Sequence, residues 1–129
     1  MAYRLETEPA ERLVRLTFAA ASSVAEHLAS RDELVAQLDS SGYERALVDV
    51  SASPLSLSTM GQYAHAVYLA EHVPRNVRLA IVVAADRARL PSEVFMRDVA
   101  SNRGLVCELF ATQAAARAWL ADSPAAVMS

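Results

Sequence analysis

The chain has few of the residues on which several kinds of functional site depend. Cys107 is its only cysteine, so an internal disulfide and a cysteine-based metal cluster are both excluded. Its three glycines, at positions 42, 61 and 104, are too scattered for a glycine-rich phosphate loop. It has no Gly-x-Ser-x-Gly sequence to present a serine nucleophile on a strand-to-helix turn. No familiar catalytic motif is left.

Long apolar runs and a concentrated charge of one sign are also missing. The longest apolar run, 79–85, has 7 residues, whereas a membrane-spanning helix needs about 20. The 12 basic and 15 acidic residues are scattered, so there is no basic face for nucleic acid. The first residues lack the apolar centre of a secretion signal. We therefore expect a cytoplasmic protein that neither spans a membrane nor binds nucleic acid.

The first 19 residues alternate between polar and apolar side chains, which is typical of a β-hairpin. The pattern predicts strands over 2–8 and 11–19. Pro9 suits the turn between them, because it has no N–H to donate to a strand ladder. The half-polar alternation indicates an edge position with one face in water.

Helices and strands alternate along the rest of the chain. A capping box, Ser23 with Glu26, marks the start of a first helix that runs to about Ser40. Apolar runs at 46–50 and 79–83 indicate central strands covered on both faces, and a last strand is expected over 105–110. Further helices are expected over 58–73, 91–104 and from Thr112 to Ser123.

This order predicts one α/β domain over 1–124, with 125–129 as a tail that frays. The domain has an N-terminal β-hairpin followed by alternating α/β units, in a mixed five-stranded sheet with four helices.

The second helix carries more apolar surface than one buried stripe needs. A core-facing stripe is already supplied by Met60, Tyr63, Ala64, Val67, Tyr68 and Ala70. A further apolar side is formed by Ala66, Leu69 and Val73, and the third helix shows a similar excess at Val94, Phe95 and Met96. This surplus can serve a larger core, which is the favoured interpretation, a subunit contact or a pocket for an oily ligand.

Asp49 lies inside an apolar strand, near the carboxyl end where parallel sheets place their sites, and is the charged residue that most suggests a site. It can bind a ligand or orient a nucleophile. The favoured interpretation is that its carboxylate accepts hydrogen bonds from N–H groups of the following loop. Arg87, after the strand at 79–83, is a candidate anion contact beside Ser58. His65 and His72 are expected at the surface, about 10 Å apart along one helix, too far to share a metal.

The order of elements and three stretches of sequence resemble those of SpoIIAA-like proteins of the STAS superfamily. The stretches are Leu47-Val-Asp-Val50 before a serine-rich loop, Arg78-Leu-Ala-Ile-Val-Val83, and the ending Ala116-Arg-Ala-Trp-Leu120. The resemblance covers nearly the whole chain. It implies a bacterial source and a relation to lipid-binding domains of similar architecture, the STAS/SEC14 type.

In the regulatory branch of that superfamily, anti-sigma-factor antagonists carry Asp-Ser-(Ser/Thr)-Gly, and a partner kinase phosphorylates the serine. The matching stretch here is Leu57-Ser58-Thr59-Met60, so only the hydroxyl pair matches. The resemblance makes Ser58 a candidate phosphoacceptor. Its residue type and position at a helix start are also those of an ordinary helix cap, which is the favoured interpretation.

The leading hypothesis is a non-enzymatic binding module, without cofactor or metal, that holds a protein partner or a small apolar ligand. The candidate contact residues are Asp49, Ser56, Ser58, Thr59, Met60, Leu69, Phe95 and Met96. A homodimer is compatible with the same apolar surplus. The alternatives are a phosphorylation switch at Ser58 and a small hydrolase or transferase built on Asp49, Ser58 and Arg87.

Overall fold

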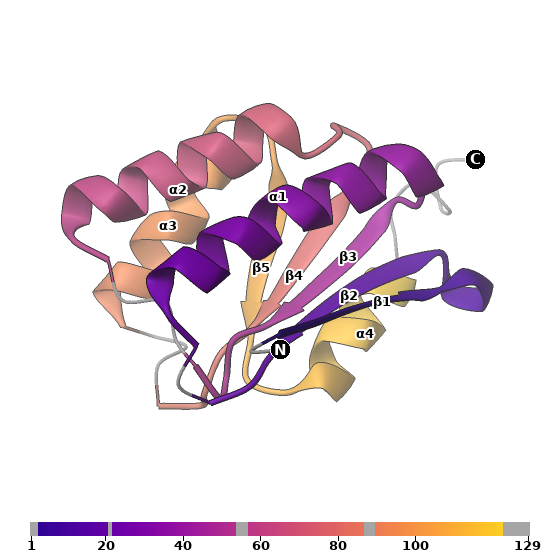
Figure 1. Ribbon diagram of the computed structural model, residues 1–129, viewed down its shortest axis with the longest axis horizontal. Helices are drawn as coiled ribbons and strands as arrows, with labels where there is room; N and C mark the ends of the chain where they lie inside the picture. Colours follow the sequence, from indigo (N-terminus) through magenta and orange to yellow (C-terminus); the bar gives the residue numbers. More distant parts are fainter. Residues whose placement is uncertain (1–2, 21, 54–56, 87–89, 123–129) are drawn as a thin grey trace.

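One mixed β-sheet organises the chain (Figure 1). The computed structural model describes residues 3–20, 22–53, 57–86 and 90–122. The strands are β1 Tyr3–Glu8, β2 Leu13–Phe18, β3 Arg45–Asp49, β4 Arg78–Val82 and β5 Val106–Phe110. The helices are α1 Val24–Ser41, α2 Thr59–His72, α3 Pro91–Asn102 and α4 Gln113–Ala121, with a 3-10 turn, η1, at Pro9–Glu11. This confirms the predicted α/β class, with a mixed five-stranded sheet and four helices.

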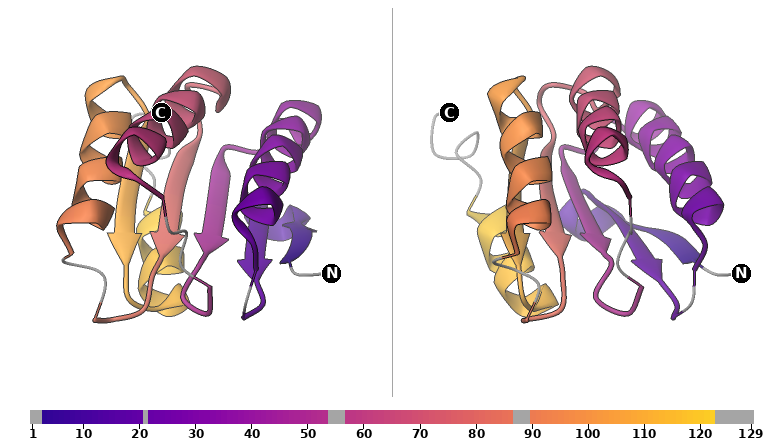
Figure 2. Two further views of the ribbon diagram at one scale, coloured as in Figure 1. Left: turned by 60° about the vertical axis from the view of Figure 1, so that its left-hand side comes forward. Right: turned by 90° about the vertical axis from the view of Figure 1, so that its left-hand side faces the viewer.

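The strands lie side by side in chain order, β1 to β5, with β1 antiparallel to β2 and every later pair parallel. Each parallel connection therefore moves one strand in the same direction. Because such crossovers are right-handed, α1, α2 and α3 all lie on one face of the sheet. The chain crosses to the other face only after β5, where α4 packs against β3, β4 and β5 (Figure 2).

Alternation along the strands divides the buried side chains between two layers. In β2, Val14, Leu16 and Phe18 belong to the core under α1 to α3, while Leu13 belongs to the core under α4. The α4 layer is completed by Leu47, Ala80, Val82, Ala116 and Leu120. Both faces of β3 and β4 are thus covered, as their nearly continuous apolar sequences require.

The ends of the elements follow local chemistry. The Ser23 side chain accepts a hydrogen bond from the Glu26 backbone N–H, Glu26 accepts one in return, and Gly42 ends α1 with φ of 71°. The predicted start of the second strand at residue 11 is wrong. Pro9 opens the 3-10 turn and Arg12 has a φ of 51°, so extended backbone resumes only at Leu13.

The predicted buried stripe of α2 is also wrong. Met60 is 74% exposed and Tyr63 is 39% exposed, whereas Ala66 and Leu69 are buried. Close contact with α3 sets the rotation of α2, and this turns its second apolar side toward the interior. Two apolar sides on one helix satisfy the same periodicity, so packing alone decides between them.

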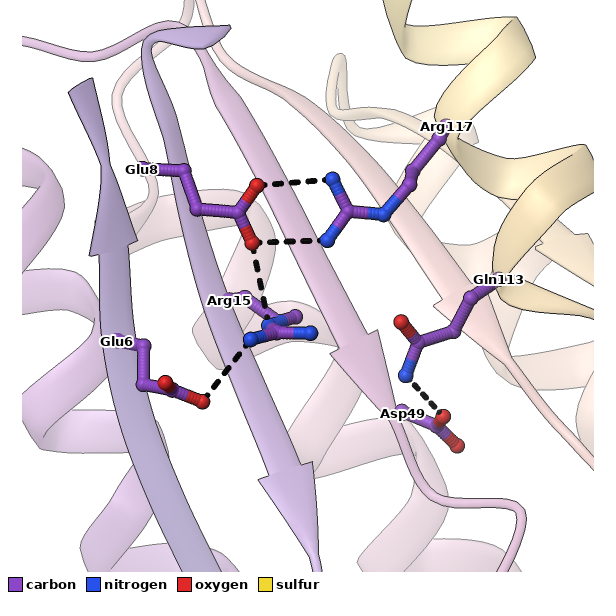
Figure 3. A network of polar contacts seen from close by, with 6 residues as sticks. All are labelled: Glu6, Glu8, Arg15, Asp49, Gln113 and Arg117. Atoms are coloured by element: carbon purple, nitrogen blue, oxygen red, sulfur yellow. Dashed lines mark hydrogen bonds and ion pairs between the residues drawn. The ribbon is translucent and has the colours of Figure 1, made fainter. Parts of the chain in front are cut away.

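Charged side chains join the first strand to the last helix on the α4 face of the sheet (Figure 3). The Arg117 guanidinium donates hydrogen bonds of 2.9 and 2.8 Å to the two carboxylate oxygens of Glu8. Arg15 lies 3.3 Å from Glu8 and 3.1 Å from Glu6. The bonds from Arg117 lower the pKa of Glu8 below its ordinary value. The face expected to be in water is therefore a half-buried network of ion pairs.

Replacing Arg117 with methionine should destabilise the fold by about 1 kcal/mol near neutral pH, because a bidentate pair contributes more than an ordinary surface pair. Since the pKa of Glu8 is lowered on folding, its contribution is present above the ordinary carboxyl pKa and disappears as the pH falls through the folded value. Urea unfolding of both proteins near pH 7 and near pH 3 measures the loss of stability at each pH. Arg12→Met, which breaks a pair with Glu44 on a more exposed side chain, is the matched control. An equal loss for Arg117→Met at both pH values contradicts the assignment.

Candidate functional site

A cavity of about 80 Å³ lies between the sheet and the three helices on one of its faces. The strands β2 to β5 form its floor and α1, α2 and α3 form its walls. Most of the lining is aliphatic, including Leu16, Val48, Leu69, Ile81, Met96 and Leu109. Cys107 also lines it, and burial raises the pKa of that thiol to about 12. The cavity is thus apolar over most of its surface.

The cavity exists because α2 is held away from the sheet. Its close backbone contacts are with α3, while α1 packs on β1 and β2, and α3 packs on β5. The helix residues that face the space include Ala66 and Ala100, each with a single methyl group. Such short side chains leave a gap that larger ones would fill.

Polar side chains meet the cavity where α1 faces α2. The backbones of these two helices do not pack closely, and side chains bridge them instead. An Arg31 terminal nitrogen, Nη1, lies 3.3 Å from His65 Nδ1, and the Arg31 guanidinium lies 3.6 Å from the centre of the Tyr68 ring. Tyr68 donates a hydrogen bond of 2.6 Å to Asp32. We refer to Arg31, Asp32, His65 and Tyr68 as the Arg31 bridge.

The His65 ring in this bridge is neutral near pH 7. Burial lowers its pKa to about 4, and the positive charge of Arg31 acts in the same direction. Because a guanidinium can only donate, His65 Nδ1 is the acceptor, and the ring proton must be on Nε2. His65 is therefore not the surface histidine that its sequence position suggests, whereas His72 is exposed.

The free energy of unfolding should depend on pH in the way that the lowered pKa of His65 requires. Since the folded pKa of His65 is lowered to about 4, the unfolded chain binds a proton first, and stability falls as the pH drops from about 6.5 to about 4. His65→Gln, which keeps an acceptor for Arg31, should remove a component on the order of 2 kcal/mol from that fall. Nitrogen-15 NMR of the imidazole rings should show the Nε2–H tautomer. A His65 pKa near 6.5 contradicts the burial seen here.

Asp49 lies on the opposite face of the sheet from the cavity, beside α4. It is 8% exposed, and its carboxylate accepts hydrogen bonds from the Ser51 N–H at 2.9 Å and the Ser51 hydroxyl at 2.6 Å. Gln113, at the start of α4, donates a third bond of 2.7 Å (Figure 3). These three bonds anchor both the loop after β3 and the first turn of α4, and they use most of the acceptor capacity of the carboxylate.

Asp49→Ala should cost about 2 kcal/mol of stability, because it leaves buried donors without their charged acceptor. Asp49→Asn should cost less, since an amide can still accept from Ser51 and pair with a rotated Gln113 side chain. Urea unfolding measures both, with Asp39→Ala on the exposed side of α1 as the control. A cost for Asp49→Ala no larger than that of the control would show that the carboxylate is not an anchor.

The other candidate residues are dispersed. Ser58 caps α2, and its hydroxyl accepts a hydrogen bond from the Gly61 N–H at 3.1 Å. Thr59 and Met60 follow it on the exposed first turn. Leu69 and Met96 meet at the cavity, whereas the half-buried Phe95 does not line it. Ser56 and Arg87 lie outside the described residues.

Sequence reasoning missed the polar residues of the cavity on α1. His27 is 4% exposed, its ring stacks on Phe18 with centroids 4.0 Å apart, and its Nε2 lies 3.5 Å from the Ser53 hydroxyl. Burial lowers its pKa. Positions 27, 31, 34 and 38 repeat at the spacing of one helix face, so His27 and Arg31 share a stripe with two buried leucines. That spacing was the available signal.

No helix among the described residues is both long and apolar enough to cross a membrane. Within the same residues, no three His, Cys, Asp or Glu side chains converge in a way that could hold a metal ion. Comparisons of the chain with protein-family models, with curated proteins and with solved structures gave no match. The resemblance to SpoIIAA-like proteins therefore stays an expectation drawn from the sequence.

Proposed function

We propose that this chain is a non-enzymatic binding module that holds a small apolar ligand in the cavity under α1, α2 and α3. The observation that carries the proposal is the apolar cavity of about 80 Å³. Protein interiors normally have few voids larger than a water molecule. A void of this size lowers stability by about 2 kcal/mol at about 24 cal/mol per Å³, and a ligand that fills it recovers that energy.

The cavity volume limits the size of the ligand. An apolar cavity of about 150 Å³ holds a benzene molecule, and the present cavity is about half as large. The cavity as it stands in this structure therefore accepts an apolar group of about three or four carbon atoms. A larger group requires α2 to move outward, and its few backbone contacts with the sheet make α2 the helix able to do so.

The position of the polar groups favours binding over catalysis. Asp49 and Ser58, the residues on which a hydrolase would depend, lie on the opposite sheet face and at an exposed helix start, respectively. Neither lines the cavity. The resemblance to a family grouped with lipid-binding domains supports the same proposal, and with it a cytoplasmic, bacterial setting.

Filling the cavity should abolish ligand binding without damaging the fold. Ala66 lines the cavity and is 1% exposed, so Ala66→Leu places a larger side chain where the ligand would lie. NMR titration of the unmodified protein with two neutral probes, 1-propanol and 1-butanol, should shift the methyl signals of Ala66 and Met96. Ala66→Leu should abolish these shifts and leave the melting temperature equal or higher.

Ala64→Leu is the matched control, because Ala64 lies on the exposed side of the same helix. It should bind both probes like the unmodified protein. Should Ala66→Leu unfold the domain, Ala66→Val gives a smaller version of the test. The proposal fails if the unmodified protein shows no probe-induced shift at the cavity, or if the filled variants bind as well as the control.

A further inference from the structure

The charge of Arg31 is incompletely matched within the protein. Only 17% of its side chain is exposed, and its Nε is buried without a hydrogen-bond partner. The nearest oxygen of Asp32 is 3.7 Å from that Nε, and the Asp32 side chain is 63% exposed. Arg117, in contrast, donates two hydrogen bonds of 2.9 and 2.8 Å to one carboxylate. Arg31 therefore keeps a donor that a carboxylate could still use.

The residue that carries this unused donor lines the cavity. Arg15, Arg45 and Arg78 also have a buried Nε without a hydrogen bond, but none of the three lines this space. Arg31 lines it together with His65. Because His65 Nδ1 accepts from Arg31, its Nε2–H is a second donor. Two residues with hydrogen-bond donors, one of them charged, thus lie side by side in the lining of a cavity that is mostly apolar.

The remaining charged groups of the cavity belong to α3. Arg97 is engaged by Asp98 at 2.7 Å and by Glu108, and Glu93 is 5% exposed with interactions of its own. An anion would be repelled by Glu93 and attracted by Arg31. The α1 to α2 side of the cavity is therefore where a negative charge is favoured, with the apolar floor of the sheet beside it.

Resting on the proposed function, we infer that the ligand is a short aliphatic monocarboxylate, with its carboxylate on Arg31 and His65 and its chain in the cavity. A guanidinium binds a carboxylate through two parallel N–H bonds, and Nε with a terminal nitrogen supplies that pair. A single charge matches one guanidinium, whereas a dianionic phosphate would also face Asp32 and Glu93. The cavity volume sets the chain at about four or five carbons, the carboxyl carbon included.

The test compares pentanoate with pentanamide, a neutral molecule of nearly the same shape. We expect calorimetric titration of the unmodified protein to give an affinity for pentanoate about tenfold higher than for pentanamide, the size of one charge-assisted hydrogen bond. Arg31→Met should remove the preference, because it weakens pentanoate binding far more than pentanamide binding. Arg12→Met, which changes an arginine that does not line the cavity, is the matched control and should keep the preference.

A second series varies chain length and salt. Affinity should peak at butanoate or pentanoate and fall for octanoate, and added salt should weaken pentanoate binding but not pentanamide binding. If Arg31→Met does not fold, Arg31→Gln and the salt series decide the question. Equal affinities for the acid and the amide overturn the inference while the binding function stands. Failure of every probe, charged or neutral, overturns the binding function itself.

Discussion

The direction in which the chain crosses the sheet is the constraint on which the rest of the structure depends. Every parallel connection moves one strand onward, so right-handed crossovers place three helices on one face. With α1 over β1 and β2 and α3 over β5, the remaining helix must lie between them. There α2 contacts α3 more closely than the sheet, and the space beneath it becomes the cavity. The topology thus creates the site before any polar residue is considered.

The Arg31 bridge is the consequence of that spacing. Because the α1 and α2 backbones are not in close contact, long side chains span the distance between them. Burying a guanidinium is costly unless its charge is compensated. Here the Tyr68 ring and the His65 acceptor compensate part of it, and the mostly exposed Asp32 carboxylate lies 3.7 Å from Nε. A carboxylate seated at the cavity would supply the hydrogen-bond acceptor that Nε lacks and that Asp32, at 3.7 Å, does not provide.

The sequence was sufficient for the fold because the elements are marked locally. The capping box at Ser23, the left-handed Gly42 and the apolar runs of β3 and β4 place these elements within one or two residues of their observed bounds. These signals act between neighbours in the chain. They are therefore independent of how the helices finally pack.

The cavity could not be predicted in the same way, because it depends on packing between distant elements. Both sides of α2 are apolar, and only contact with α3 shows that Ala66 and Leu69 face inward. Charged side chains are usually solvated, so residue type alone favours the outer side of α1 for Arg31. Its position on the stripe of Leu34 and Leu38 pointed inward, but spacing alone could not outweigh its charge. Composition and spacing conflicted at the residue that matters most for the proposed ligand.

The two faces of the sheet differ in how fully their polar groups are used. On the α4 face, Glu8 accepts two hydrogen bonds from Arg117, and Asp49 accepts three from Ser51 and Gln113. Such saturated groups stabilise the fold and have little capacity for a ligand. On the other face, Arg31 Nε lacks an acceptor beside an apolar space. The candidate site therefore differs from the α4 face in two ways: it has a hydrogen-bond donor without a partner, and it has a cavity beside that residue. The charged residues on the α4 face only stabilise the fold.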